Sequence, residues 1–80
     1  MKLPRDLSGA ELVAVLCRDF GYSRAGQQGS HIILLTEAPK HHRIAIPNHD
    51  SLRLGTLNGI LNAVARAKEI QKEEVLEKLR

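Results

Sequence analysis

Cysteine and aromatic residues are almost absent from this chain of 80 residues. It contains one cysteine, one phenylalanine, one tyrosine and no tryptophan. A single cysteine excludes an internal disulfide and a cysteine-based zinc cluster, the usual staples of very small domains. Two aromatic rings cannot form a platform on which successive single-stranded bases stack. Any nucleic acid would have to be recognised through backbone charge, shape and, in RNA, the 2′-hydroxyl.

Long apolar runs are missing as well. No run approaches the ~20 residues of a membrane-spanning helix, and charge at Lys2 and Arg5 comes too early for a signal peptide. We therefore expect a soluble, cytoplasmic protein without membrane association. A chain this short supports one hydrophobic core, so residues 1–80 are expected to form a single domain that holds no cofactor.

Acidic residues are scarce in the middle of the chain, where only Glu37 lies between Gly21 and His49. The basic or titratable residues of the same stretch are Arg24, Lys40, Arg43 and all four histidines. With a net charge of +3 and a pI near 9.4, this distribution points to a polyanionic partner. A merely solvated basic surface is the alternative.

The first predicted helix begins at Ser8. Ser8 and Glu11 have the spacing of a capping box, in which each side chain accepts from the other residue's backbone N–H. An apolar stripe follows at three- and four-residue spacing, until Gly21 ends the helix. Its members are Leu12, Val13, Leu16, Cys17 and Phe20.

Three extended segments follow, at roughly Tyr22–Gly26, Ser30–Thr36 and His42–Pro47. Turns are expected at Gly26–Gly29, which is "GQQG", and at Glu37–Lys40, which is "EAPK". Proline lacks the N–H that a sheet requires, so Pro47 should end the third strand. The simplest arrangement is an antiparallel three-stranded sheet.

The run from Ile32 to Leu35 carries apolar side chains to both faces of that sheet, because neighbouring residues point in opposite directions. One face should pack on the helices. The other should form an exposed apolar patch or be covered by a second copy, in a homodimer, or by a different protein.

A second helical stripe runs from Leu57 to Ala65, and further apolar residues from Ile70 to Leu79 predict a short final helix. The predicted fold class is α+β, with one helix, a three-stranded antiparallel sheet and then helices, all on one face of the sheet.

Taken in order, these segments resemble the HicA-type toxin family. The resemblance rests on "LSGAELVAVL", "FGY", "QQGSHIIL", "IAIPNH", "GTLNGIL" and "EEVLEKL", which begin at residues 7, 20, 27, 44, 55 and 73. The family consists of messenger-RNA-cleaving toxins of toxin-antitoxin pairs. The resemblance implies a fold like the double-stranded-RNA-binding domain, an mRNA substrate and a cognate HicB-like antitoxin as partner.

The resemblance also implies site residues. The catalytic histidine of the family's glycine-serine-histidine motif corresponds to His31, with Gly29 and Ser30 as its turn. His49 matches a histidine that often follows the third strand, without an equal catalytic role. The chain departs from the family at Gly26, where many members have an arginine. It departs again at Glu69 and Gln71, where members commonly have glycine and serine or threonine, so the last two helices are expected to form a bend within one longer helix.

These residues suit metal-free RNA cleavage. Imidazole titrates near ~6.5 and can serve as general base or general acid, a contribution of ~10²- to 10⁴-fold in rate. The backbone amides of Gly29 and Ser30 are candidate donors to a phosphate oxygen. The cations proposed to bind the substrate are Arg24, Lys40 and Arg43.

Other interpretations remain open from the residues alone. His31 could be a structural histidine bonded to a backbone carbonyl. The chain could be a non-catalytic RNA- or DNA-binding module, which the missing arginine at position 26 favours, or a protein-interaction domain that uses its apolar sheet face. The pairs His41-His42 and His49-Asp50 also resemble metal ligands, although adjacent strand residues point to opposite faces, so His41 and His42 could share an ion only if they lie in the turn.

Overall fold

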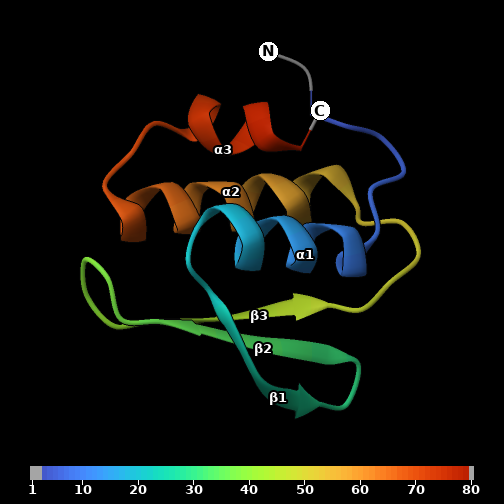
Figure 1. The fold of residues 1–80 in the computed structure, drawn as a ribbon. Helices are drawn as coiled ribbons and strands as arrows, with labels where there is room; N and C mark the ends of the chain where they lie inside the picture. The colour runs from blue at the N-terminus through green and yellow to red at the C-terminus, as the bar shows by residue number, and fades with distance from the viewer. Residues whose placement is uncertain (1–2, 80) are drawn as a thin grey trace.

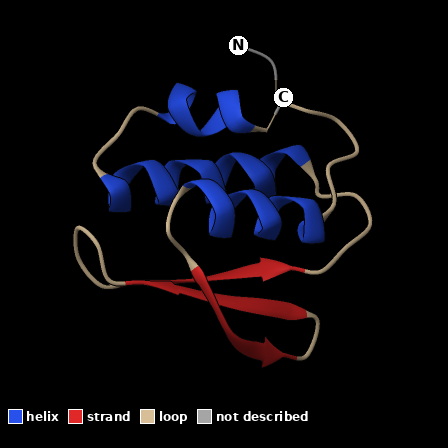
Figure 2. Cartoon of the chain, in the orientation of Figure 1, coloured by secondary structure: helices blue, strands red, loops and turns tan. Residues whose placement is uncertain are grey.

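Three helices lie on one side of a three-stranded antiparallel sheet in the computed structural model, which describes residues 3–79 (Figures 1 and 2). None of the helices in this range is long and apolar enough to cross a bilayer. The arrangement confirms the predicted α+β class and its likeness to the double-stranded-RNA-binding domain. In chain order the elements are α1 (Gly9–Asp19), β1 (Ser23–Gln28), β2 (His31–Thr36), β3 (His42–Pro47), α2 (Leu54–Lys68) and α3 (Lys72–Lys78).

Helix α1 begins with the predicted capping box. The Glu11 N–H donates to Ser8 Oγ at 3.0 Å, and the Ser8 N–H donates to Glu11 Oε1 at 2.8 Å. The hydrogen bond from the Ser8 backbone lowers the pKa of the Glu11 carboxyl below its usual value. At the other end the Phe20 N–H donates to Leu16 O, and Gly21, at φ +70°, turns the chain towards β1.

Strand β2 lies between β1 and β3 and pairs antiparallel with both. The predicted β3 is confirmed, but β1 runs two residues further than predicted, to Gln28, and the connection is the two residues Gly29 and Ser30 alone. Gln27 and Gln28 pair with Ile32 and His31, so the predicted four-residue turn was wrong. A two-residue hairpin turn needs backbone with positive φ, which Gly29 supplies at +57°.

A bulge interrupts β1. Arg24 pairs with Leu34 and Gly26 pairs with Ile33, so Ala25 is an extra residue between the two pairs. Directly paired residues share a face of the sheet. The bulge therefore decides which side chains of β1 point towards the helices and which point away from them.

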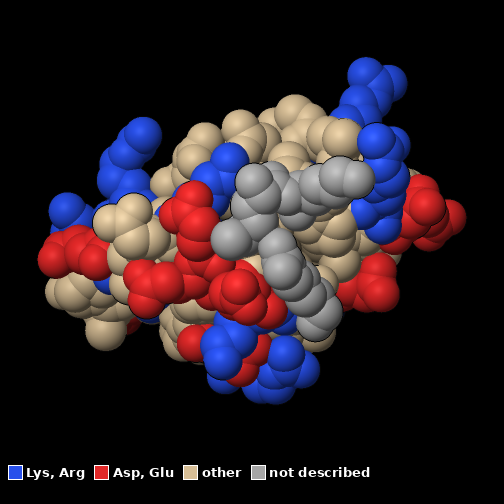
Figure 3. Space-filling view, turned by 90° about the horizontal axis from the view of Figure 1, so that it is seen from above, with Lys and Arg blue, Asp and Glu red and all other residues tan. Residues whose placement is uncertain are grey.

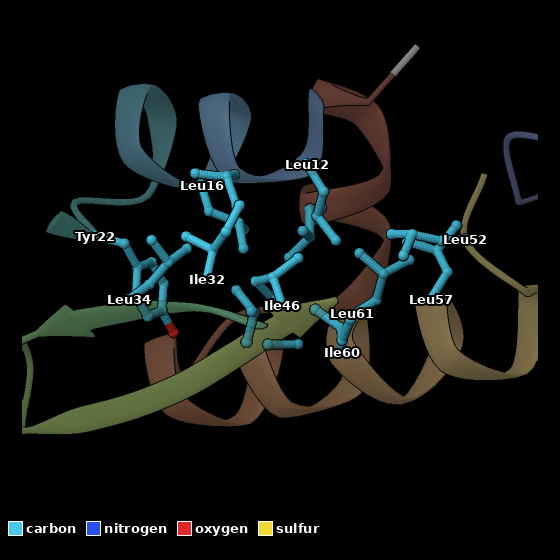
Figure 4. Packing of buried hydrophobic residues seen from close by; sticks show 14 of the residues in the cluster. Leu12, Leu16, Tyr22, Ile32, Leu34, Ile46, Leu52, Leu57, Ile60 and Leu61 are labelled. Atoms are coloured by element: carbon cyan, nitrogen blue, oxygen red, sulfur yellow. The ribbon is translucent and has the colours of Figure 1, made fainter. Parts of the chain in front are cut away.

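The core lies between the helices and one face of the sheet, here called the inner face. In Figure 4 side chains of α1, α2, β2 and β3 converge in this layer. Helix α3 packs on α2 and adds Val75 and Leu76 to the same cluster. The ten largest fully buried side chains are Leu12, Leu16, Ile32, Leu34, Ile46, Leu57, Leu61, Leu76, Val64 and Val75.

The opposite face of the sheet, here called the outer face, carries His31, Ile33 and Leu35 of β2. The expectation of an exposed apolar patch on this face was wrong. Ile33 is only 6% exposed and Leu35 is half-buried. Within residues 3–79 the one large hydrophobic side chain that is exposed is Leu54, which lies on α2 and not on the sheet. The two flanking strands shield side chains of a central strand even where no helix covers them.

The chain breaks between α2 and α3, contrary to the expected bend within one longer helix. Glu69 adopts the left-handed conformation, with φ +59° and ψ +43°. Its N–H and that of Ile70 donate to carbonyls of the last turn of α2, and the Gln71 N–H donates to Glu74 Oε2 at 2.8 Å to start α3. These hydrogen bonds satisfy both helix ends, so the reversal does not require glycine at this position.

Glu69→Gly should therefore stabilise the protein. An L-residue in the left-handed region costs roughly 1 kcal/mol that glycine avoids, so we expect the free energy of unfolding to rise by about that amount in urea titrations. Glu73→Gly, in the first turn of α3, is the matched control and should lower it by a similar amount. Equal destabilisation by both changes would contradict the conformational role of Glu69.

Candidate active site

The β1–β2 turn presents the predicted motif at one end of the sheet. Gly29, Ser30 and His31 are all exposed, and Gly29 has open space around its Cα. The Gln27 side-chain amide donates to Gly29 O at 3.2 Å and braces the turn. The motif is thus accessible to a large ligand and has a defined backbone.

His31 is the first residue of β2 and lies on the outer face. It is paired with Gln28 on one side and Pro47 on the other. Its exposure argues against a packed, purely structural histidine. Because its backbone belongs to the central strand, the imidazole is exposed at a fixed position in the sheet.

The segment after β3 is fastened beside this turn. The Asn48 N–H donates to Ser30 O at 2.7 Å, and the Gly9 N–H donates to His49 O at 2.9 Å. His49 is exposed at the same end of the sheet as His31. The start of α1 thereby holds the segment that flanks the motif.

Gly9 makes this junction possible. A Cβ at position 9 would lie 2.0 Å from the Pro47 carbonyl oxygen, so the backbone of α1 approaches β3 more closely than a side chain permits. Sequence analysis missed this contact, because a glycine inside a capping box also fits an ordinary helix start.

Two of the three predicted substrate-binding cations lie away from His31 along the sheet. Lys40 lies in the β2–β3 loop, beyond Thr36, and the distance from His31 to Thr36 is about 17 Å at ~3.4 Å per residue. Arg43 pairs with Leu35 on the outer face, about 14 Å along β3 from the partner of His31 at ~3.4 Å per residue.

Arg24 lies nearer to the turn but on the inner face, because it pairs with Leu34. Its guanidinium donates to Gln27 Oε1 at 3.2 Å. Gln27 in turn donates to Gly29 O, so the exposed Arg24 side chain lies one residue away from the turn, whereas Gly26 lies on the outer face with His31. The structure brings together Gly29, Ser30 and His31 with Arg24 beside them, and it places Lys40 and Arg43 towards the other end of the sheet.

A polar cluster occupies the far end of the sheet. The Tyr22 hydroxyl and His42 Nδ1 share a hydrogen bond of 2.9 Å. The Lys68 ammonium donates to Thr36 Oγ1 at 2.7 Å and to Ala38 O at 2.6 Å, and lies 4.9 Å from the centre of the Tyr22 ring. This cluster fastens the β2–β3 loop to α2.

Burial and charge shift the pKa values in this cluster. Desolvation raises the pKa of Tyr22 to about 12 and lowers the pKa of Lys68. Desolvation, with repulsion from Lys68 and His41, lowers the pKa of His42. Within residues 3–79 there is no group of three or more histidine, cysteine or acidic side chains placed to hold a metal ion. His41 pairs with the Glu37 carboxylate at 3.0 Å.

The helical side of the molecule differs from the sheet ends. Seen from above α3, acidic and basic side chains lie next to one another (Figure 3). Among the residues that the structure describes on this face, such an alternation of charge is typical of a solvated surface.

A comparison with protein families finds a match over most of the chain. The family model described as "HicA toxin of bacterial toxin-antitoxin" matches residues 9–65. That range covers α1, the sheet and most of α2, and it includes the motif at Gly29, Ser30 and His31. Searches of curated proteins and of solved structures give no match.

Proposed function

The chain belongs to the HicA toxin family of bacterial toxin-antitoxin systems, and we propose that it is a metal-independent endoribonuclease that cleaves messenger RNA in the cytoplasm. A cognate HicB-like antitoxin neutralises it. The observation that carries the proposal is the exposed imidazole of His31, which opens the central strand next to a glycine turn.

In the proposed reaction the ribose 2′-hydroxyl attacks the adjacent phosphorus. A general base takes the hydroxyl proton, and a general acid protonates the departing 5′ oxygen, which leaves a 2′,3′-cyclic phosphate and a 5′-hydroxyl. His31 acts in one of these two roles. The backbone N–H groups of Gly29 and Ser30 are the donors nearest to it in the chain for the phosphate oxygens.

His49 is the candidate for the complementary proton transfer. It is exposed at the same end of the sheet, and its backbone is held by Gly9. A two-histidine arrangement supplies both an acid and a base without a metal ion.

Incubation with a labelled transcript tests the proposal against its alternative, a binding module of the same fold. An endoribonuclease shortens the RNA in the presence of a chelator and leaves cyclic phosphate ends. A binding module retards the RNA in a gel and leaves it intact, and that result would refute the enzymatic proposal.

Gly26 supports a further prediction about substrate binding. By its pairing with Ile33 it lies on the outer face, two residues along β1 from the partner of His31, and an added Cβ meets nothing within 4 Å. We expect Gly26→Arg to increase RNA affinity several-fold. It should also steepen the dependence of log affinity on log salt by about one unit, because one more phosphate is neutralised.

Ser23→Arg is the matched control for this substitution. Ser23 lies on the same strand and face but pairs with Leu35, at the far end of the sheet. It should change affinity less. Equal gains from the two arginines would mean that only net charge matters and would contradict a phosphate position beside Gly26.

A further inference from the structure

A basic pocket lies at the end of the sheet opposite to His31. Its volume is about 260 Å³, and it opens between the β2–β3 loop and the C-terminal half of α2. Its lining consists of Lys40, His41, His42, Ala63, Arg66 and Ala67. Four of these six side chains are cationic or can become so.

The positive groups come from separate elements that the structure holds together. Lys40 and His41 belong to the loop, His42 begins β3, and Arg66 lies in the last turn of α2. Lys68 donates hydrogen bonds to Thr36 and Ala38, and these bonds hold the β2–β3 loop against α2. The two elements that line the pocket are therefore fixed relative to each other.

His42 lies close to other basic groups. Desolvation lowers the pKa of His42, and repulsion from Lys68 and His41 lowers it further. An acidic side chain next to the lining, Glu37, is exposed and paired with His41.

The neutral imidazole of His42 has a ring N–H that can donate a hydrogen bond to a ligand. The phenol of Tyr22 keeps its proton at neutral pH and is a better donor than acceptor towards an imidazole nitrogen. We therefore assign the Tyr22 O–H as donor to His42 Nδ1, which places the proton of the neutral ring on Nε2. A neutral His42 can then donate Nε2–H without first becoming charged.

We propose that this pocket binds a phosphate group, and that in RNA cleavage the group is a backbone phosphate several nucleotides from the scissile one. Binding of phosphate follows from the pocket itself, whereas its origin in RNA rests on the proposed function. Arg66 and Lys40 supply charge-assisted hydrogen bonds, and the imidazoles add neutral or charged donors.

The lining favours a phosphate over an acidic segment of a protein partner. Its apolar members are Ala63 and Ala67, and it lacks the large aromatic or aliphatic anchors that protein interfaces bury at their centre. Arg43, exposed on β3, follows His42 of the pocket directly in the chain and lies on the outer face. An RNA strand that passes the free edge of β3 would therefore meet positive charge on its way to His31.

The first test is a titration of the full chain with inorganic phosphate, followed by NMR of backbone amides and imidazoles, with sodium chloride at equal ionic strength as reference. We expect saturable shifts at residues 40–42 and 63–67. Arg66→Gln and Lys40→Gln should each weaken binding by about tenfold. Lys78→Gln removes the same charge from α3 and should leave binding unchanged. Shifts spread over all cationic residues, with an equal effect of Lys78→Gln, would overturn the site.

The second test separates the source of the phosphate. In a His31→Ala background, Arg66→Gln should weaken binding of a long single-stranded RNA about fivefold. In the otherwise wild-type chain it should not change cleavage of a dinucleotide too short to reach the pocket.

Unchanged affinity for the long RNA, alongside intact phosphate binding, would overturn the assignment to RNA and leave a site for free phosphate. Weakened antitoxin binding with unchanged phosphate and RNA binding would overturn the proposal in favour of a protein contact. The phosphate titration retains its meaning even if the chain fails to cleave RNA, so the two proposals fail separately.

Discussion

His31→Ala is expected to abolish RNA cleavage while leaving the fold intact. Loss of a general acid or base lowers the rate by ~10²- to 10⁴-fold, which brings it below detection in most transcript assays. The side chain is exposed and lies outside the hydrophobic cluster, so the thermal unfolding midpoint should stay within about a degree of the wild-type value. Growth inhibition on expression should disappear together with cleavage.

Gln28→Ala is the matched control for this experiment. Gln28 is the direct cross-strand partner of His31 on the same face, and both side chains are exposed. The Gln28 amide has no group that transfers a proton near neutral pH. It should retain cleavage to within a few-fold.

Two further measurements distinguish catalysis from binding. RNA affinity of His31→Ala should remain close to that of the wild type, and added imidazole should restore part of its activity. An undiminished rate in His31→Ala would remove the proposed mechanism, and a collapse of RNA affinity without imidazole rescue would reassign His31 to substrate binding.

Gly9→Ala is expected to be the most destabilising single-methyl change in the protein. The added Cβ would lie 2.0 Å from Pro47 O and 3.1 Å from Asn48 Cα, and both are backbone atoms that a rotamer change cannot move. Relief requires α1 to shift away from β3, at a cost of about 3 kcal/mol or more. Urea or thermal unfolding measures the loss directly.

The same substitution should also reduce cleavage, for a reason separate from stability. The Gly9 N–H holds His49 O, so displacement of α1 displaces the segment beside the Ser30 carbonyl. We expect a lower rate even at temperatures where Gly9→Ala is fully folded.

Gly59→Ala provides the matched control for Gly9→Ala. Gly59 lies inside α2 with nothing within 4 Å of an added Cβ, so alanine should stabilise the protein by roughly 0.5–1 kcal/mol through helix propensity. A Gly9→Ala protein as stable as the wild type would show that the junction between α1 and β3 yields easily.

Local signals in the sequence were sufficient for most of the fold. The hydroxyl and carboxylate of Ser8 and Glu11 are three residues apart and need no tertiary context to cap a helix, so that prediction is confirmed at the level of single hydrogen bonds. The stripe from Leu57 to Ala65 is likewise a property of one segment, and it is buried as expected. Hydrophobic periodicity and capping depend on neighbours in the chain.

Local sequence signals could not predict where the cationic side chains lie relative to His31. A bulge adds one residue to β1, and each added residue exchanges the two faces of a strand. Nothing in "SRAGQQ" marks Ala25 as the extra residue, so the sequence could not tell that Arg24 faces inward and Gly26 outward. Lys40 and Arg43 are close to His31 in the chain, but strand length carries them to the other end of the sheet.

The bulge has a second consequence, for self-association. A three-stranded sheet that is not closed leaves two rows of unpaired backbone groups, which are templates for adding foreign strands and for aggregation. In β1 the extra residue interrupts the regular spacing of the unpaired backbone groups between Arg24 and Gly26. Another extended chain therefore cannot form a continuous ladder of hydrogen bonds with β1. The regular row belongs to β3, from His42 to Ile46, before Pro47 ends it. A peptide strand that joins this sheet would therefore be directed to one side of the molecule.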